Sequence, residues 1–260
     1  MQTITSRDNS RYKEVRQLAL EPRARRKAGK TVLDGIHLCQ AYLQHVGTPQ
    51  ICVVSESAMT NAEVQTIAEQ SASAGALCLS LPDALYKPLS QVENGVGILC
   101  IVPIPHPAVP AKLTRYTVLL DQIQDPGNLG SILRSAAAAG IEHIFCSSGT
   151  AAAWSPRVLR AGMGAHFQLT IIESAELLPL IETSDIPVLA TSPRAAQSIY
   201  DVDLRQPVAW LFGHEGQGIS DHLQIPAAHL VSIPHLGEME SLNVAASAAV
   251  CFFEQVRQKR

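Results

Sequence analysis

The sequence predicts an α/β protein with a mostly parallel sheet. Short, continuous apolar runs alternate with segments whose apolar residues recur at helical spacing. Continuous apolar runs are typical of parallel strands that helices cover on both faces. Hydrophobic residues make up 47% of the 260 residues and charged residues 17%, which is enough apolar material for such a core.

A proline-rich stretch divides the chain. The sequence "VPIPHPAVPAKL", residues 102–113, holds four prolines. Each proline fixes its own backbone and biases the preceding residue toward extended conformations. We therefore predict a linker over 104–114, between a small α/β domain at 1–103 and a larger domain at 115–260.

Each domain shows the same alternation of elements. In the first we expect, in order, a helix in 10–30 that runs into a basic cluster, a strand, turn and helix in 31–46, a strand at 51–55, a helix at 61–75 and a strand at 95–102. In the second we expect strands at 116–123, 143–147, 168–172, 186–191, 208–213 and 230–234, with helices at 129–140, 155–165, 174–182 and from 242 onward.

The bulk properties exclude several classes of protein. Six scattered cysteines form no C-x-x-C pair, so we expect buried, reduced thiols and neither a zinc site nor disulfides. The N-terminus is polar and no apolar run reaches membrane-spanning length, which predicts a cytoplasmic protein without membrane contact. The net charge of −3 means that any nucleic-acid binding requires a local basic patch.

The first stretch whose residues could form part of a functional site is "LLDQIQDPGNLGSILRSAAAAG". A strand leads through a Pro-Gly turn into a helix, and Asn128 takes the N-cap position, which by itself could be its entire role. Arg134 lies in an alanine-rich, apolar helix. Its side chain either reaches to the surface or faces a pocket, and the residues alone favour the surface.

The second stretch is "VAWLFGHEGQGIS". A buried strand runs directly into a turn with Gly213, Gly216 and Gly218, and Glu215 lies inside that turn. Ligands of open α/β sheets bind beyond the carboxyl ends of strands. A tight surface turn with a solvated glutamate is the alternative. The stretch matches neither a dinucleotide fingerprint nor a phosphate-binding loop with its lysine.

The third stretch, "SLNVAASAAVCFF", begins the last predicted helix. Ser241 is the expected N-cap and the helix starts at Leu242. Most sides of this helix are apolar, so we expect it to be buried on several sides, with a second copy of the protein as one cover.

Together, "DPGNLGSILRSAAAAG", "LFGHEGQG" and "IPHLGEMESLNVAASAAV" resemble, in order and spacing, the three motifs of the SpoU (TrmH) RNA ribose 2′-O-methyltransferases of the SPOUT class. The stretch "GKTVLDGIHLCQAYL" is similar, more loosely, to the RNA-binding domain that often precedes this catalytic domain. The resemblance implies a trefoil-knotted catalytic domain, a homodimer and S-adenosylmethionine bound inside the knot.

The resemblance also assigns residues. It implies a cofactor site at Leu211, Gly213, Ile233 and Leu242, and a catalytic set of Asn128, Arg134, Glu215, Ser241 and Asn243, without a metal. Family accounts make Arg134 the general base. A guanidinium stays protonated and is a poor base, so Arg134 could instead orient the hydroxyl or bind a neighbouring phosphate.

The basic run "RARRKAGK" is the predicted RNA contact, through Arg23, Arg25, Arg26 and Lys27. Taken alone, such a run is most often solvated surface. Arg157 and Arg160 are further candidates. Ribosomal RNA is the expected target because of the additional domain, with transfer RNA as the alternative. A non-catalytic RNA-binding or ribosome-assembly protein and a nucleotide-dependent oxidoreductase are the rival classes.

Overall fold

The computed structural model describes residues 1–92, 95–225 and 228–260. Its contacts divide the chain into two compact units. The first joins Met1–Pro105 with Trp154–Phe167, and the second joins His106–Ala153 with Gln168–Arg260. The sequence placed Trp154–Phe167 inside the second domain, whereas these residues pack with the first unit. The division into an RNA-binding and a catalytic domain stays a prediction.

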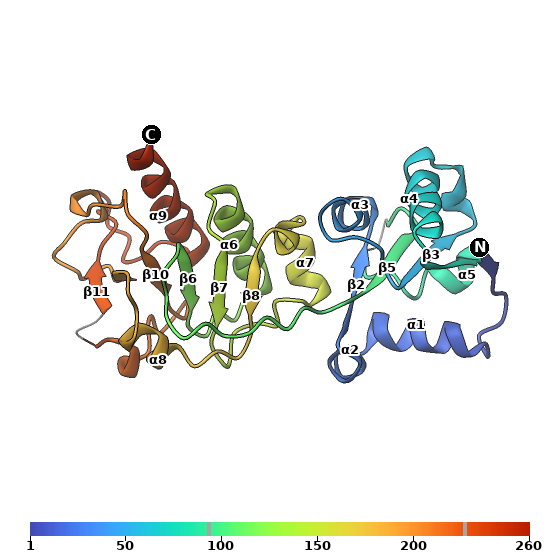
Figure 1. The fold of residues 1–260 in the computed structure, drawn as a ribbon, viewed down its shortest axis with the longest axis horizontal. Coiled ribbons are helices and arrows are strands. Elements are labelled where there is room, and N and C mark those ends of the chain that lie inside the picture. Colours follow the sequence, from blue (N-terminus) through green and yellow to red (C-terminus); the bar gives the residue numbers. More distant parts are fainter. Residues whose placement is uncertain (93–94, 226–227) are drawn as a thin grey trace. The chain divides into compact units, whose positions relative to one another are not determined.

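The first unit is a five-stranded mixed sheet with helices on both faces (Figure 1). The strand order is β1-β4-β3-β5-β2, and β5 runs antiparallel to β2 and β3. Its strands are β1 (Gln2–Thr3), β2 (Lys30–Asp34), β3 (Ile51–Ser55), β4 (Leu77–Leu81) and β5 (Ile98–Pro103). Its helices are α1 (Ser10–Leu20), α2 (Pro22–Ala28), α3 (Ile36–His45), α4 (Ala62–Ser73), α5 (Asp83–Tyr86) and α7 (Pro156–Gly162), with 3₁₀ turns η1 (Ser57–Thr60) and η2 (Ala165–Phe167).

Pro22 separates the predicted first helix into α1 and α2, because proline disfavours helical backbone at the residue before it. Arg25, expected to contact RNA, is buried instead. Its Nη1 donates to the carbonyl oxygens of Leu18 (2.9 Å) and Ala19 (3.2 Å), near the C-terminal end of α1. Arg25 therefore ties α2 to α1, and burial lowers the pKa of its guanidinium.

Strand β4 was not predicted from the sequence. Its residues Leu77, Leu79 and Leu81 alternate with Cys78 and Ser80, which is strand periodicity. Leucine has no strong strand preference, and the pattern directly follows the predicted helix end at 75. The signal was present but weak.

The second unit is a six-stranded sheet in the order β11-β9-β10-β6-β7-β8, and every strand pair in it is parallel. Its strands are β6 (Thr117–Leu120), β7 (His143–Cys146), β8 (Thr170–Ile172), β9 (Val188–Thr191), β10 (Ala209–Phe212) and β11 (Ala228–Val231). Its helices are α6 (Pro126–Ala138), α8 (Leu177–Glu182) and α9 (Val244–Lys259), with 3₁₀ turns η3 (Ile199–Asp201) and η4 (Asp221–Leu223). The predicted α/β class with a mostly parallel sheet is confirmed.

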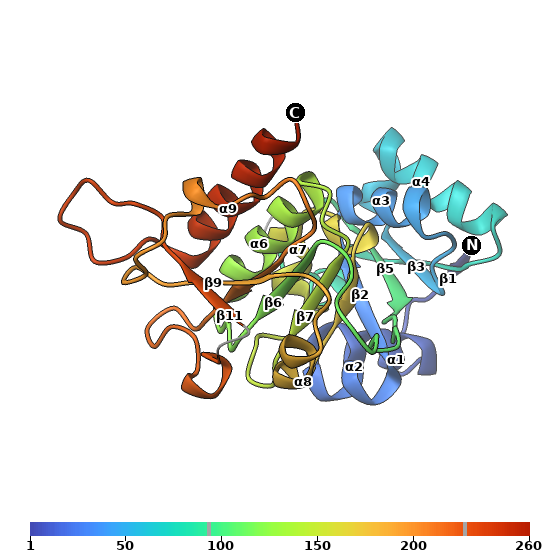
Figure 2. The ribbon, with the colours of Figure 1, turned by 60° about the vertical axis from the view of Figure 1, so that its left-hand side comes forward.

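Strand β10 shows how both faces of this sheet are covered. Trp210 and Phe212 point toward α9: the Trp210 indole N–H donates to Gln255 (2.9 Å), and Phe212 packs edge-to-face with Phe252. Leu211 points to the opposite face, into the apolar cluster that includes α8 and η4. Helices α6 and α9 lie side by side on the first face (Figure 2). Both faces of β10 are thus buried, as its continuous apolar sequence requires.

All six cysteines are buried and free. Within the described ranges, no helix combines the length and apolar character needed to cross a bilayer. In those same ranges, no group of three or more His, Cys, Asp or Glu side chains is arranged to hold a metal ion.

Candidate functional site

The three predicted motifs meet at one edge of the second sheet. Strands β6 and β10 are neighbours, so the loops that follow their carboxyl ends are neighbours too. These loops contain the start of α6 and the glycine-rich turn after Phe212. The start of α9 joins them because α9 packs along α6. The carboxyl edge of a parallel sheet is where α/β proteins bind ligands.

Asp125, not Asn128, caps α6. Its carboxylate accepts from the Asn128 backbone N–H (2.8 Å), and Pro126 occupies the first helical position. The predicted N-cap role of Asn128 is therefore wrong. Asn128 lies inside the first turn, which leaves its side-chain amide free for other contacts.

That amide joins all three motifs. Asn128 Nδ2 donates to Glu215 Oε1 (3.0 Å), and Asn128 Oδ1 accepts from Asn243 Nδ2 (2.9 Å). Asn243 Oδ1 in turn accepts from the backbone N–H groups of Ala245 (2.9 Å) and Ala246 (3.2 Å), so Asn243 is the N-cap of α9. The predicted N-cap, Ser241, lies two residues earlier. We call these three hydrogen-bonded side chains, Glu215, Asn128 and Asn243, the amide network.

Glu215 is fixed by further bonds. Its carboxylate accepts from the backbone N–H groups of Gln124 (3.3 Å) and Asp125 (3.2 Å). Burial raises the pKa of Glu215, but the hydrogen bonds from Asn128, Asp125 and Gln124 outweigh burial and bring the pKa below its ordinary value. Glu215 is therefore ionised at neutral pH, and the network weakens only as the pH falls through this lowered pKa.

The glycine-rich turn that carries Glu215 folds back on itself. A Cβ atom on Gly213 would lie 2.2 Å from the backbone of both Gly218 and Ile219, so only glycine fits there. Gly218 has φ +76°, a conformation that favours glycine. His214 Nδ1 accepts from the backbone N–H groups of Gly216 (2.9 Å) and Gln217 (3.1 Å) and stabilises the turn from inside.

Asp121, which was not predicted as a site residue, supports this turn. Asp121 directly follows β6 and is buried. Its carboxylate accepts from the Ser220 backbone N–H (2.9 Å) and from the Ser147 hydroxyl (3.2 Å). Its position after a buried strand was the available signal, as for Glu215. Without a glycine-rich neighbourhood that signal did not separate Asp121 from an ordinary turn residue.

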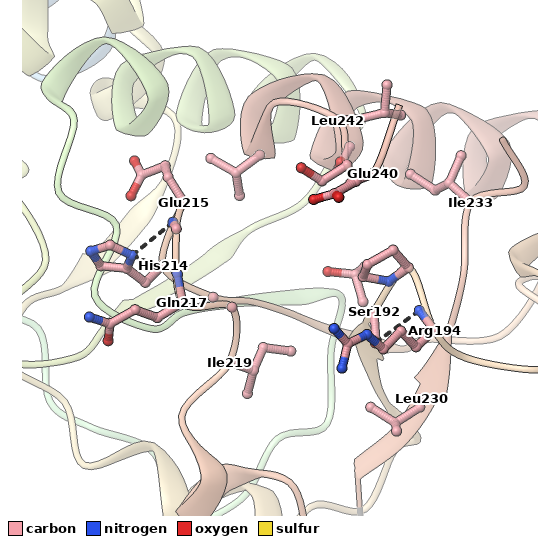
Figure 3. A pocket seen from close by; sticks show the side chains of 18 of the residues that line it. Ser192, Arg194, His214, Glu215, Gln217, Ile219, Leu230, Ile233, Glu240 and Leu242 are labelled. Atoms are coloured by element: carbon pink, nitrogen blue, oxygen red, sulfur yellow. Dashed lines mark hydrogen bonds between the residues drawn. The ribbon is translucent and has the colours of Figure 1, made fainter. Parts of the chain in front are cut away.

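A cavity of about 790 Å³ opens beside the amide network (Figure 3). Five of the predicted site residues line it: Gly213, Glu215, Ile233, Ser241 and Leu242. Arg194, in the loop after β9, and Glu240, before α9, lie on facing sides of the cavity and were not predicted. The walls combine apolar side chains, the backbone of the glycine-rich turn and a few charged groups, which is typical of small-molecule sites.

Two predicted site residues lie elsewhere. The Leu211 side chain is fully buried in the core and does not line the cavity. The Leu211 carbonyl accepts from the Thr191 hydroxyl (3.4 Å). Arg134 is exposed on α6, outside both the cavity lining and the amide network, and has no hydrogen bond or ion pair among the described residues. Of the predicted RNA contacts, Arg23, Arg26 and Lys27 are exposed on α2.

Comparison with known proteins identifies the family. Residues 115–253 match the sequence model of the SpoU rRNA Methylase family. An uncharacterized tRNA/rRNA methyltransferase of Synechocystis sp. is 31% identical and covers 99% of this chain and 94% of its own length. The chain belongs to the SpoU rRNA methylase family. This SpoU protein is also 30% identical to the 23S rRNA (guanosine-2′-O-)-methyltransferase RlmB of Bordetella pertussis, over 90% of this chain and 99% of that protein.

A solved structure agrees in fold. The AdoMet-bound rRNA methyltransferase from Sinorhizobium meliloti superposes with a TM-score of 0.85 at 25% identity, over 98% of this SpoU protein and 97% of that chain. The predicted enzyme class, an S-adenosylmethionine-dependent RNA 2′-O-methyltransferase, is confirmed.

Proposed function

We propose that this SpoU protein methylates a ribose 2′-hydroxyl of 23S ribosomal RNA, with the second unit as the catalytic domain. The amide network carries this proposal. It brings one polar side chain from each of three distant motifs to the rim of a cavity large enough for a nucleoside cofactor. The names of relatives such as the Bordetella pertussis enzyme supply the RNA target.

The cavity suits S-adenosylmethionine. Leu230, Ile233 and Leu242 provide apolar surface for an adenine ring, and Gly213 lines the cavity beside them. Arg194 and Glu240 provide opposite charges for the carboxylate and amino groups of the methionine portion. When bound, the cofactor supplies an electrophilic methyl group.

The protein's own residues position the attacking ribose. The amides of Asn128 and Asn243 hold the sugar at the cavity rim, and Glu215 fixes the Asn128 amide by accepting from its Nδ2. Holding two reactants in attack geometry supplies much of the rate enhancement in such transfers. Glu215 is in this account a positioning residue, because its pKa is lowered and it makes a weak base.

Arg134 binds the RNA phosphate beside the target ribose. It is exposed, and a guanidinium is a permanently charged, bidentate phosphate ligand rather than a base. Ribose-methylation mapping of ribosomal RNA, in cells with and without the gene, should show one 2′-O-methyl mark that depends on the gene. Arg134→Ala should fail to restore that mark, while purified Arg134→Ala still binds S-adenosylmethionine like the wild type.

The matched control is Arg205→Ala, which removes an exposed arginine of the same unit that pairs with Asp203 and should restore the mark. If Arg134→Ala restored the methyl mark, Arg134 would not be part of the active site. An unchanged methylation map would contradict the RNA target, and a failure of the wild type to bind cofactor would contradict the enzyme itself.

We also propose that the catalytic unit is knotted, as its family resemblance implies, and that it forms a homodimer through α9. An apolar stripe on α9 is partly uncovered at Ala246, Ala249, Phe253 and Val256, which recur at helical spacing. Phe253 is 48% exposed. An exposed apolar helix face is typical of a protein interface.

Sedimentation equilibrium should give the wild type about twice the 27.9 kDa chain mass. Phe253→Glu should shift the mass toward that of one chain, because it places a charge in an apolar contact. Val109→Glu, at an exposed valine in the proline-rich stretch, is the control and should leave the dimer intact. If the Phe253→Glu variant remained a dimer, this face of α9 would not be the dimer interface.

A further inference from the structure

Positive charge is concentrated at the start of this chain. Residues 1–30 contain nine Lys and Arg residues against three Asp and Glu residues. The remaining 230 residues contain eleven and twenty. The first segment therefore has a net charge of +6 and the rest −9, which the overall charge of −3 conceals. Such a local excess is the electrostatic footprint of a polyanion site.

Part of this charge surrounds a groove on α1. The groove has a volume of about 450 Å³, and its charged lining residues are Arg7, Lys13, Arg16 and Glu21. Pro88, in the loop after α5, forms part of the wall. Three cations thus face one anion around a concave surface, and none of them belongs to the "RARRKAGK" run.

The arginines of this groove are available to a ligand. Arg7 and Arg16 are exposed and form no ion pair with any described residue. Lys13 lies 3.1 Å from Asp8, but the Asp8 side chain is 93% exposed, and such surface pairs contribute little. In the second unit, Arg115, Arg205 and Arg257 each pair with a carboxylate, whereas Arg134 pairs with none among the described residues.

The floor of the groove is rigid. Tyr12 is buried and its hydroxyl donates to the Leu85 carbonyl (3.2 Å), which ties α1 to α5. Asn9 caps the start of α1 by accepting from the Arg11 and Tyr12 backbone N–H groups. Arg25 ties α2 to the other end of the helix. The helix that carries Lys13 and Arg16 is therefore fixed before a ligand binds, which lowers the entropic cost of binding.

We infer that this groove binds backbone phosphates of the RNA substrate through Arg7, Lys13 and Arg16. The inference rests on the proposed function and adds a second contact surface to α2. Arginine forks match phosphate oxygens in a bidentate manner. Phosphate contacts position a protein on RNA without reading sequence, so the groove determines affinity rather than the choice of nucleotide.

The test is a salt titration of RNA binding with full-length protein and a fluorescein-labelled fragment of 23S ribosomal RNA. Arg7→Gln/Arg16→Gln should weaken binding about tenfold and reduce the slope of log affinity against log salt by about 1 to 2, since each lost phosphate contact removes about one counterion. In methylation assays, KM for the RNA should rise while kcat and cofactor affinity stay unchanged. Glu21→Gln should have the opposite effect, tighter RNA binding, because it removes the only carboxylate among the described residues lining the groove.

Arg115→Gln/Arg205→Gln is the charge-matched control, since it removes two exposed arginines of the second unit. The inference that the groove binds RNA would be overturned by an unchanged salt slope in the Arg7→Gln/Arg16→Gln variant. An equal loss of RNA affinity in the control would overturn it too. If the wild type binds the RNA but does not methylate it, the proposed function fails. The salt slope then still shows whether the groove contacts RNA phosphates. Thermal unfolding of each variant excludes a folding defect.

Discussion

Glu215→Gln should lower kcat for methyl transfer about 100-fold, the loss expected when a reacting group shifts by about 1 Å. A glutamine amide cannot accept from the backbone N–H groups of Gln124 and Asp125 and from Asn128 as the carboxylate does. The Asn128 amide then loses its fixed orientation, and with it the contact to Asn243. Single-turnover transfer of a tritiated methyl group to RNA measures this loss directly.

Cofactor affinity separates positioning from binding in this experiment. Calorimetry should show S-adenosylmethionine bound to Glu215→Gln within a few-fold of the wild type, because glutamine keeps the size of the Glu215 side chain in the cavity wall and the apolar walls are unchanged. Glu142→Gln makes the same chemical change at an exposed carboxylate paired with Arg115 and should keep full activity. A Glu215→Gln enzyme with normal kcat would show that the amide network does not position the ribose.

Gly213→Ala should disrupt the cofactor cavity. The added methyl group would lie 2.2 Å from the backbone of Gly218 and Ile219, and backbone atoms cannot move aside as a flexible side chain does. We expect the free energy of unfolding to fall by about 1–3 kcal/mol, as for other overpacked sites. We also expect cofactor affinity to fall about tenfold or more, since a loop shift that costs about 1.4 kcal/mol in the complex has that effect.

Gly216→Ala is the matched control three residues along the same turn. A Cβ atom there meets nothing closer than the His214 ring at 3.6 Å, an ordinary contact distance. Its free energy of unfolding should stay within about 0.5 kcal/mol of the wild type. Urea denaturation of both variants gives the comparison, and equal stabilities would mean that the turn tolerates a side chain at Gly213.

Much of this site was predictable because it follows strand ends. The apolar run before Glu215 marks a buried strand, and a parallel sheet brings its neighbours' carboxyl ends to the same edge. The helix starts were less predictable. The sequence "DPGN" holds two residues that can cap a helix, Asp125 and Asn128, and "SLN" holds Ser241 and Asn243. Capping preference alone does not choose between them.

Other features depend on contacts between distant parts of the chain. Arg25 belongs to a basic run, and only the turn at Pro22 brings its guanidinium onto the last carbonyls of α1. Likewise, the Thr31 hydroxyl donates to the Trp154 carbonyl (2.6 Å) across 123 positions of sequence. No local pattern predicts this contact, which is why residues 154–167 were assigned to the other domain.

The bond between Asn128 and Asn243 spans 115 positions and has a consequence for biosynthesis. A nascent chain that ends before Asn243 already contains the whole basic groove, whose cations all lie within the first 16 residues. It has no complete amide network, because α9 is not yet made. Contacts between residues far apart in sequence are slow to form. If the groove binds RNA as we infer, ribosome-bound chains acquire affinity for RNA before the amide network that we propose for methyl transfer can form, since that network needs the α9 segment.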